Sequence, residues 1–124
     1  MFGADTASRG LGMELLDVGD GTATVRMRIG PAMINGHGIA HGGYVFLLAD
    51  TAFACACNSR GRVTVAAGAD ITFIAPARDG DMLVASAAER ASYGRSGIYD
   101  VTVRRGDEVI AEFRGRSREA GQLG

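Results

Sequence analysis

The stretch that decides the fold runs from residue 41 to residue 61 and reads HGGYVFLLADTAFACACNSRG. Residues 42–58 are apolar almost all the way round a helical projection, which is typical of a helix buried on most of its sides. At about 1.5 Å per residue such a helix is roughly 25 Å long. The run Asn58-Ser59-Arg60-Gly61 supplies a stop signal, in which Gly61 can adopt the left-handed conformation. The sequence therefore predicts one long buried helix near the middle of the chain.

Extended segments flank this helix. Residues 22–29 alternate, with Val25, Met27 and Ile29 on one face and polar side chains on the other, which predicts a half-buried strand. Four more strands are predicted after the helix, over residues 63–74, 82–90, 98–104 and 109–116, with turn signals between them. A strand, a buried helix and four strands in meander order predict an α+β domain in which an antiparallel sheet wraps one helix. Open sheet edges and so apolar a helix favour an oligomer.

Length and charge narrow the class of protein. At 124 residues, the chain is predicted to be one domain, residues 1–124, with loose ends over 1–11 and 118–124. All 13 basic residues are Arg, and 14 acidic residues give a net charge of -1, which offers no electrostatic case for nucleic acid. The absence of Lys excludes a lysine Schiff base and a P-loop lysine.

The sequence shows no targeting segment, and its two cysteines cannot form a disulfide with each other. The N-terminus lacks a basic region followed by an apolar core, and no apolar stretch is long enough to span a bilayer, so neither secretion nor a membrane is predicted. Cys55 and Cys57 point about 200° apart on a helix and cannot bridge, which fits a reducing cytoplasm. Two His residues and no acidic cluster predict no metal site.

Asp50 is the unusual residue of the predicted helix. Its neighbours are apolar, no cationic side chain lies three or four positions away, and Thr51 is its only polar companion. An unpaired carboxylate in apolar surroundings costs several kcal/mol unless its pKa shifts or it finds partners. A solvent-facing position is the alternative, but no polar stripe recurs at helical spacing. Perturbed carboxylates tend to mark active sites, so Asp50 is a candidate catalytic residue.

His41-Gly42-Gly43 precedes the helix. Glycines at a helix start leave backbone N–H groups unobstructed, and the helix dipole favours a developing oxyanion there. A tight turn alone would also explain the glycines. Asp50 lies roughly 12–13 Å further along the helix axis, too far to serve an oxyanion held at its own helix start. If both groups act together, the site must be shared between two subunits.

The loop before the helix carries two more polar candidates. Asn35 and His37 could each reach the helix start, although a loop histidine such as His37 is more often only exposed. A thiol nucleophile paired with His41 is disfavoured because more than three helical turns separate the two groups. Neither thiol has a nearby cation to lower its pKa, so inert buried thiols are expected.

These residues, read together, resemble the PaaI-type acyl-CoA thioesterases of the hotdog fold, in particular the phenylacetate-pathway subgroup. The resemblance spans residues 12–117. It is carried by NGH at 35–37, HGGYVFLLADTAFA at 41–54, NSRG at 58–61, FIAP at 73–76, GD at 80–81, SGIYDV at 96–101 and FRGRS at 113–117.

The resemblance implies a hotdog, with one long central helix wrapped by a curved antiparallel sheet, and a homodimer that forms a homotetramer. By position, Asp50 would be general base or nucleophile, Gly42 the oxyanion donor, Asn35 the group that orients water or substrate, and His41 a support for the carbonyl or the loop. Gly43 would contact substrate. Some relatives hold the water with a Ser or Thr on the strand after the helix, where only Thr64 lies close by, so that role is unassigned.

The predicted function is a cytoplasmic hydrolase of aryl-acyl-CoA thioesters such as phenylacetyl-CoA or hydroxyphenylacetyl-CoA. Coenzyme A is part of the substrate, and no cofactor is predicted. Arg95 is the candidate for the coenzyme A phosphates. One alternative is a hotdog dehydratase of 3-hydroxyacyl thioesters with His41 and Asp50 as its acid–base pair. The other is a non-catalytic acyl-CoA-binding protein, for which the chain has no output domain.

Overall fold

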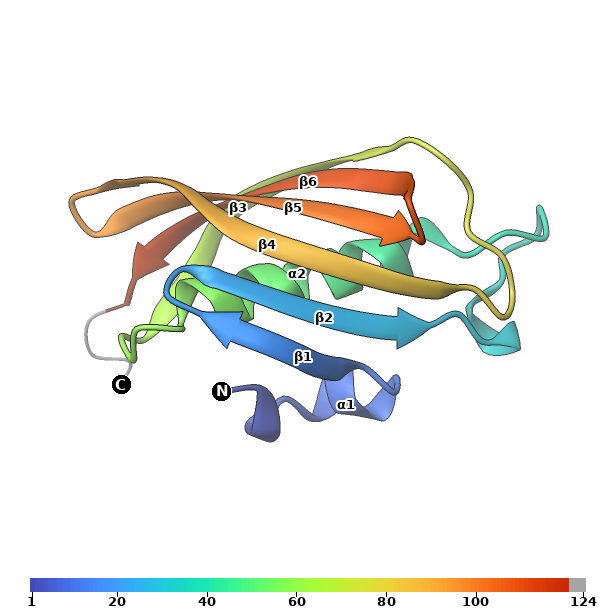
Figure 1. Ribbon diagram of the computed structural model, residues 1–124, viewed down its shortest axis with the longest axis horizontal. Coiled ribbons are helices and arrows are strands. Elements are labelled where there is room, and N and C mark those ends of the chain that lie inside the picture. The colour runs from blue at the N-terminus through green and yellow to red at the C-terminus, as the bar shows by residue number, and fades with distance from the viewer. Residues whose placement is uncertain (121–124) are drawn as a thin grey trace.

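The computed structural model describes residues 1–120. In this part of the chain a six-stranded antiparallel sheet curves around one long helix, α2 (Gly42–Cys57), as Figure 1 shows. The strands are β1 (Glu14–Gly19), β2 (Thr22–Arg28), β3 (Thr64–Phe73), β4 (Met82–Tyr93), β5 (Ser96–Arg105) and β6 (Glu108–Glu119). The predicted α+β architecture of a sheet wrapped around one helix is therefore confirmed. Within residues 1–120 no helix combines the length and the apolar character needed to cross a bilayer.

The order of the strands differs from the predicted meander. Across the sheet it is β1-β2-β4-β5-β6-β3, so β3 pairs with β6 at one edge instead of with β4. The place beside β4 is taken by β2, which pairs with it along its whole length from Thr22–Ala88 to Arg28–Met82. Sequence order alone could not show this crossover, because β3 and β4 are both extended segments joined by a long loop.

β1 is a strand that the sequence pattern did not indicate. The two adjacent leucines Leu15 and Leu16 break the alternation of polar and apolar residues. The structure explains this break by a register shift against β2 between Leu15 and Asp17, where one extra residue is accommodated as a bulge.

The core lies between α2 and the concave face of the sheet. Phe53 and Leu48 are fully buried and face strand residues such as Val101 and Phe113, all of which are at most 3 % exposed. Phe53 packs so closely on β6 that a Cβ atom at Gly115 would lie 2.8 Å from its ring. A glycine in the interior of β6 is thus required by the bulk of the central helix.

The helix ends one residue earlier than predicted, at Cys57. The side chain of Asn58 donates to the carbonyl groups of Ala54 and Thr64 and accepts from the amide of Thr64, all within 3.0 Å. These bonds fasten the helix end to the start of β3. Gly61 has a positive φ of 82°, as its predicted role requires, but it serves the turn beyond the cap.

The prediction of a loose N-terminus over residues 1–11 is wrong. A short 3-10 turn, η1 (Phe2–Ala4), and the helix α1 (Thr6–Gly10) occupy this segment, next to β1 in Figure 1. Ser8 is only 1 % exposed, and Leu11 packs against the core. At the other end β6 continues to Glu119, so residues 118–119 are also ordered in the sheet, and residues 121–124 lie outside the described part.

Candidate active site

His41 shapes the start of α2. It is the N-cap residue, and its Nδ1 atom accepts a hydrogen bond of 2.9 Å from the amide of Gly43, while its own amide donates to the carbonyl of Met33. Because Nδ1 accepts, the neutral ring carries its proton on Nε2. The amide of Gly43 is already paired with this ring, which removes Gly43 from the predicted substrate-binding amides.

Gly42 is left as the available donor at the helix start. Its amide has no acceptor within residues 1–120. A Cβ atom on this residue would lie 2.8 Å from Cζ of Phe73, so the glycine is also required by the close approach of that ring. Phe73 is 54 % exposed and ends β3. Sequence reasoning missed it, because nothing in the pattern indicates that the end of β3 meets the start of α2.

A groove of about 530 Å³ opens beside Gly42 and Phe73. Its walls come from the loop before α2, the first turn of α2 and the chain after β3. Apart from Asn35, the lining is apolar or backbone: Ile39, Ala40, Gly42, Val45, Phe73, Ile74, Ala75, Pro76, Ala77 and Ile110. The groove therefore suits an apolar group whose polar end reaches the Gly42 amide.

Asn35 is built into the loop that borders this groove. Its Oδ1 accepts from the amides of His37, at 2.9 Å, and Ile39, at 3.3 Å, and a bridge between Ile34 and Ala40 closes the loop. Its Nδ2 has no partner within the described residues and remains available to a ligand. Asn35 and Gly42 line the same groove, so Asn35 lies near the helix start, whereas His37 is exposed.

Asp50 lies in the middle of α2 and outside this groove. It is half-buried, and no residue between 1 and 120 gives its carboxylate a hydrogen bond or an ion pair. Burial raises the pKa of Asp50 above its usual range, and the negative charge of Asp5 adds to the shift. Eight residues separate Asp50 from Gly42, about 12 Å along the axis, so one chain does not bring the two groups together.

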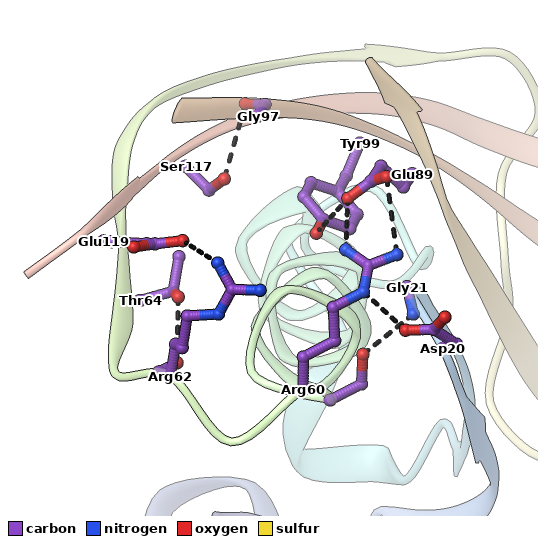
Figure 2. Close-up of polar contacts among 11 residues, drawn as sticks. Asp20, Gly21, Arg60, Arg62, Thr64, Glu89, Gly97, Tyr99, Ser117 and Glu119 are labelled. Carbon is purple, nitrogen blue, oxygen red and sulfur yellow. Dashed lines mark hydrogen bonds and ion pairs between the residues drawn. The ribbon is translucent and has the colours of Figure 1, made fainter. Parts of the chain in front are cut away.

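A second, polar pocket of about 270 Å³ lies at the opposite end of α2. Figure 2 shows that Arg60 spans Asp20 and Glu89, that Tyr99 donates to Glu89 and that Arg62 pairs with Glu119. Burial, followed by this bond to Glu89, raises the pKa of Tyr99 to about 12.

The predicted phosphate-binding residue Arg95 also lines this polar pocket, as does Thr64, for which no role was assigned. Arg95, on the turn between β4 and β5, has no ion pair within residues 1–120. The hydroxyl of Thr64 donates to the carbonyl of Arg62, so it is occupied locally. The structure therefore places Arg95 and Thr64 together, apart from Asn35, His41 and Gly42.

The two thiols behave as inert core residues. Cys55 and Cys57 are free and buried, and burial raises the pKa of each thiol to about 11. A thiolate nucleophile is therefore disfavoured at neutral pH, as predicted. In the described part of the chain, no three His, Cys, Asp or Glu side chains gather in a way that could hold a metal ion.

Comparison with known proteins decides the family. The Thioesterase superfamily model matches residues 37–112, which include the helix start, α2 and most of the sheet. The chain belongs to the thioesterase superfamily. Acyl-coenzyme A thioesterase PaaI of Escherichia coli K12 is 40% identical over 122 residues, which cover 98% of this chain and 87% of that protein.

Solved structures agree with this assignment. The structure of the E. coli PaaI protein from the phenylacetic acid degradation operon superposes with a TM-score of 0.95 at 39% identity, covering 99% of this chain and 90% of that one. A mutant structure of the phenylacetic acid degradation protein PaaI of Thermus thermophilus gives 0.90 at 32% identity, covering 93% and 99%. The predictions of a hotdog fold and of a thioester hydrolase are confirmed.

Proposed function

We propose that the protein hydrolyses acyl-CoA thioesters with an aryl-acyl group, such as phenylacetyl-CoA or its hydroxylated forms. The observation that carries this proposal is the apolar groove that ends at the unpaired amide of Gly42. An aromatic ring such as Phe73 beside the groove offers a favourable contact for a flat acyl group. The name and the operon of the E. coli relative support the same class of substrate.

In this reaction the thioester carbonyl docks on the Gly42 amide, where the dipole of α2 stabilises the oxyanion. As a general base, Asp50 takes a proton from water while the water oxygen bonds to the carbonyl carbon. The tetrahedral intermediate then expels coenzyme A thiolate, which takes up a proton. As a nucleophile, Asp50 bonds to the carbonyl carbon and expels coenzyme A thiolate, which leaves an acyl anhydride on Asp50. Water then cleaves this anhydride into the free acid and the Asp50 carboxylate. Asn35 orients water or carbonyl through Nδ2, and His41 holds the helix start.

The distance between Gly42 and Asp50 requires a partner subunit. β3 is an edge strand of the sheet. Four large apolar side chains on it or next to its ends are between 43 % and 56 % exposed: Val63, Val65, Phe73 and Ile74. If the β3 strands of two subunits paired antiparallel, these side chains would be buried, and the two α2 helices would run in opposite directions. A two-fold axis near Phe46, midway between Gly42 and Asp50, would place each Asp50 beside the partner subunit's Gly42. Two such dimers would form the homotetramer.

The nucleotide part of coenzyme A would lie near the polar pocket. Arg95 is exposed and free of acidic partners within residues 1–120, whereas Arg60 is held by two carboxylates. A guanidinium binds phosphate through two parallel hydrogen bonds. In an antiparallel pair of helices this pocket approaches the partner's groove.

Two free buried thiols fit the reducing cytoplasm as the compartment of this protein.

The hotdog dehydratase is less well supported. It needs a ring nitrogen of His41 as the base, but Nδ1 already accepts from Gly43 and Nε2 carries the proton. Release of free thiol from aryl-, short-chain and long-chain acyl-CoAs separates the two activities, because a dehydratase leaves the thioester intact. We expect hydrolysis with the highest kcat/KM for aryl-acyl-CoA. Tight binding without thiol release would instead favour the non-catalytic acyl-CoA-binding protein.

Mixing two inactive variants tests the shared site. Asp50→Asn is combined, after reversible dissociation, with Asn35→Asp, which keeps the Oδ1 acceptor of the loop but removes the Nδ2 donor. In a random mixture about half of the dimers are mixed, each with one intact site, so roughly a quarter of wild-type activity should return. If mass spectrometry confirms mixed dimers and no activity returns, the shared site is disproved.

A further inference from the structure

Two buried hydroxyl groups join the N-terminal segment to the helix that carries Asp50. Ser8 on α1 is 1 % exposed and Thr51 on α2 is 3 % exposed, and their oxygens lie 2.7 Å apart. Ser8 also contacts Asp5, the N-cap of α1, through its hydroxyl at 2.6 Å and its amide at 3.0 Å. Neither the fold nor the proposed reaction accounts for a polar chain at this place.

The direction of this chain follows from the chemistry of its end. The Asp5 carboxylate can only accept, and hydrogen bonds from Ser8 hold the pKa of Asp5 below its usual value, so it is ionised at neutral pH. The Ser8 hydroxyl therefore donates to Asp5 and must accept from Thr51. A chain from Thr51 to Ser8 to a charged acceptor is polarised in one direction, which strengthens each bond.

The chain ends one residue away from Asp50, whose position needs such support. The Asp50 carboxylate has no hydrogen bond within residues 1–120, so its location depends on the helix turn from which it projects. A reacting group displaced by about 1 Å can lose as much as two orders of magnitude in rate. The charge of Asp5 also contributes to the raised pKa of Asp50, which agrees with a close approach of the N-terminal segment.

We propose that Ser8 and Thr51 are positioning residues, which lock the N-terminal segment to α2 and hold the turn that carries Asp50 in its reactive place. This inference rests on the proposed function, in which Asp50 is the reacting carboxylate. The hydroxyl chain acts through the helix turn and touches neither substrate nor water.

The test uses Thr51→Val, which keeps the shape of the side chain but removes the donor, and Thr51→Ser, which keeps the donor. Ser8→Ala removes the other partner. We expect Thr51→Val and Ser8→Ala each to lower kcat about 5- to 20-fold with KM within about twofold, and Thr51→Ser to stay within about twofold of wild type. The double variant should be no slower than the slower single variant, because the two hydroxyls act as one unit.

A destabilised core variant controls for a general loss of stability. Val103→Ala shortens a fully buried side chain on β5 and should lower the melting temperature at least as much as Ser8→Ala without changing kcat by more than about twofold. Equal losses in Thr51→Val and Thr51→Ser, or a kcat above half of wild type in Thr51→Val, would overturn the proposal.

A readout independent of activity separates this inference from the proposed function. The carbon-13 resonance of the Asp50 carboxyl should move in Thr51→Val and return in Thr51→Ser. If wild type hydrolyses no thioester, the proposed function fails, and this resonance still decides whether the hydroxyl chain holds Asp50. If hydrolysis is normal and the resonance does not move in Thr51→Val, the positioning role is disproved.

Discussion

The two ends of α2 carry opposite chemistry. At its start, the unpaired amide of Gly42 adjoins an apolar groove, and no charged side chain lines this groove. Beyond its end, the polar pocket is lined by the three arginines Arg60, Arg62 and Arg95 and by two glutamates. The start offers what an acyl group and an oxyanion need, whereas the end offers what phosphate groups need.

This difference favours the proposal that two chains together form each active site. In acyl-CoA the pantetheine arm separates the acyl group from the phosphates, and in this chain the groove and the arginines lie at opposite ends of a helix that is roughly 24 Å long. Asp50 lies between the ends and lines neither hollow. An antiparallel partner would bring the start of one helix to the end of the other.

The largest effect is expected from Asp50→Asn, which removes the reacting carboxylate between the two ends. We expect kcat to fall at least about 1000-fold, a barrier increase of about 4 kcal/mol, with acyl-CoA binding largely retained. Steady-state kinetics and calorimetric binding measure both quantities. A variant that keeps more than about a tenth of wild-type kcat would show that Asp50 does not react.

The stability of the same variant has a definite sign. The folded pKa of Asp50 is raised, so its ionised form destabilises the fold, and this penalty appears as pH rises from the unfolded pKa through the folded one. Asp50→Asn should therefore melt at a higher temperature than wild type at neutral pH, with the difference vanishing below about pH 3. Thermal melts across this pH range check the sign.

Gly42→Ala alters the start of α2 and should have the next largest effect. The added methyl meets the ring of Phe73, which must move, and the amide loses its direct access to the groove. We expect kcat to fall about 10- to 100-fold, less than the roughly 100- to 1000-fold loss when an oxyanion donor is removed, because the amide itself remains. Gly43→Ala is the matched control, because its amide is already bonded to His41. Equal losses in both variants would argue against Gly42 as the specific donor.

Arg95→Gln alters the pocket beyond the other end of α2. We expect KM for acyl-CoA to rise about 5- to 10-fold with kcat nearly unchanged, because a phosphate contact binds ground and transition states equally. The same acyl group on pantetheine, which lacks the nucleotide, should show no change in KM. Arg104→Gln is the control, because Arg104 is exposed and lines neither hollow. An increase in KM for the pantetheine thioester as well would exclude a phosphate contact.

The sequence allowed most of α2 and its neighbourhood to be predicted. A largely apolar run such as residues 42–57 has few alternatives to a buried helix, and an unpaired carboxylate within it is conspicuous. The strands after α2 were also predicted, although β4 continues three residues beyond the predicted end at Arg90. These features depend on local periodicity and turn residues, which a single sequence displays.

Features that depend on distant contacts could not be predicted. The approach of Phe73 to Gly42 and the pairing of β3 with β6 join segments that are far apart in the chain. Ser8 lies in a polar segment whose composition resembles a free terminus, and only its contact with Thr51 reveals its burial. The N-cap spacing of Asp5 and Ser8 was the one local signal for a helix there.

The smallest expected effect is the shift of the pH–rate profile in Asp5→Asn, which alters the charge beside the middle of α2. Burial is the larger cause of the raised pKa of Asp50 and remains in this variant, but the contribution of the Asp5 charge is removed. If ionised Asp50 is the reacting form, the acidic limb of the kcat/KM profile should therefore move to lower pH. The hydrogen bond from the Arg9 side chain to the carbonyl of Gly3 does not involve Asp5, so the substitution should leave it in place.

Asparagine is also a favoured N-cap, so α1 should persist in this variant. Because the pKa of Asp5 is lowered in the folded state, its ionised form stabilises the fold above the unfolded pKa, and that stability is lost as pH falls. Asp5→Asn should thus melt slightly below wild type at neutral pH, and the two should converge as pH falls through the lowered pKa of Asp5 in the folded state. A pH–rate profile with the limb unmoved or shifted upward would show that Asp5 does not influence the reacting carboxylate. In that case burial alone would raise the pKa of Asp50, and the N-terminal segment would have no electrostatic effect on the reaction.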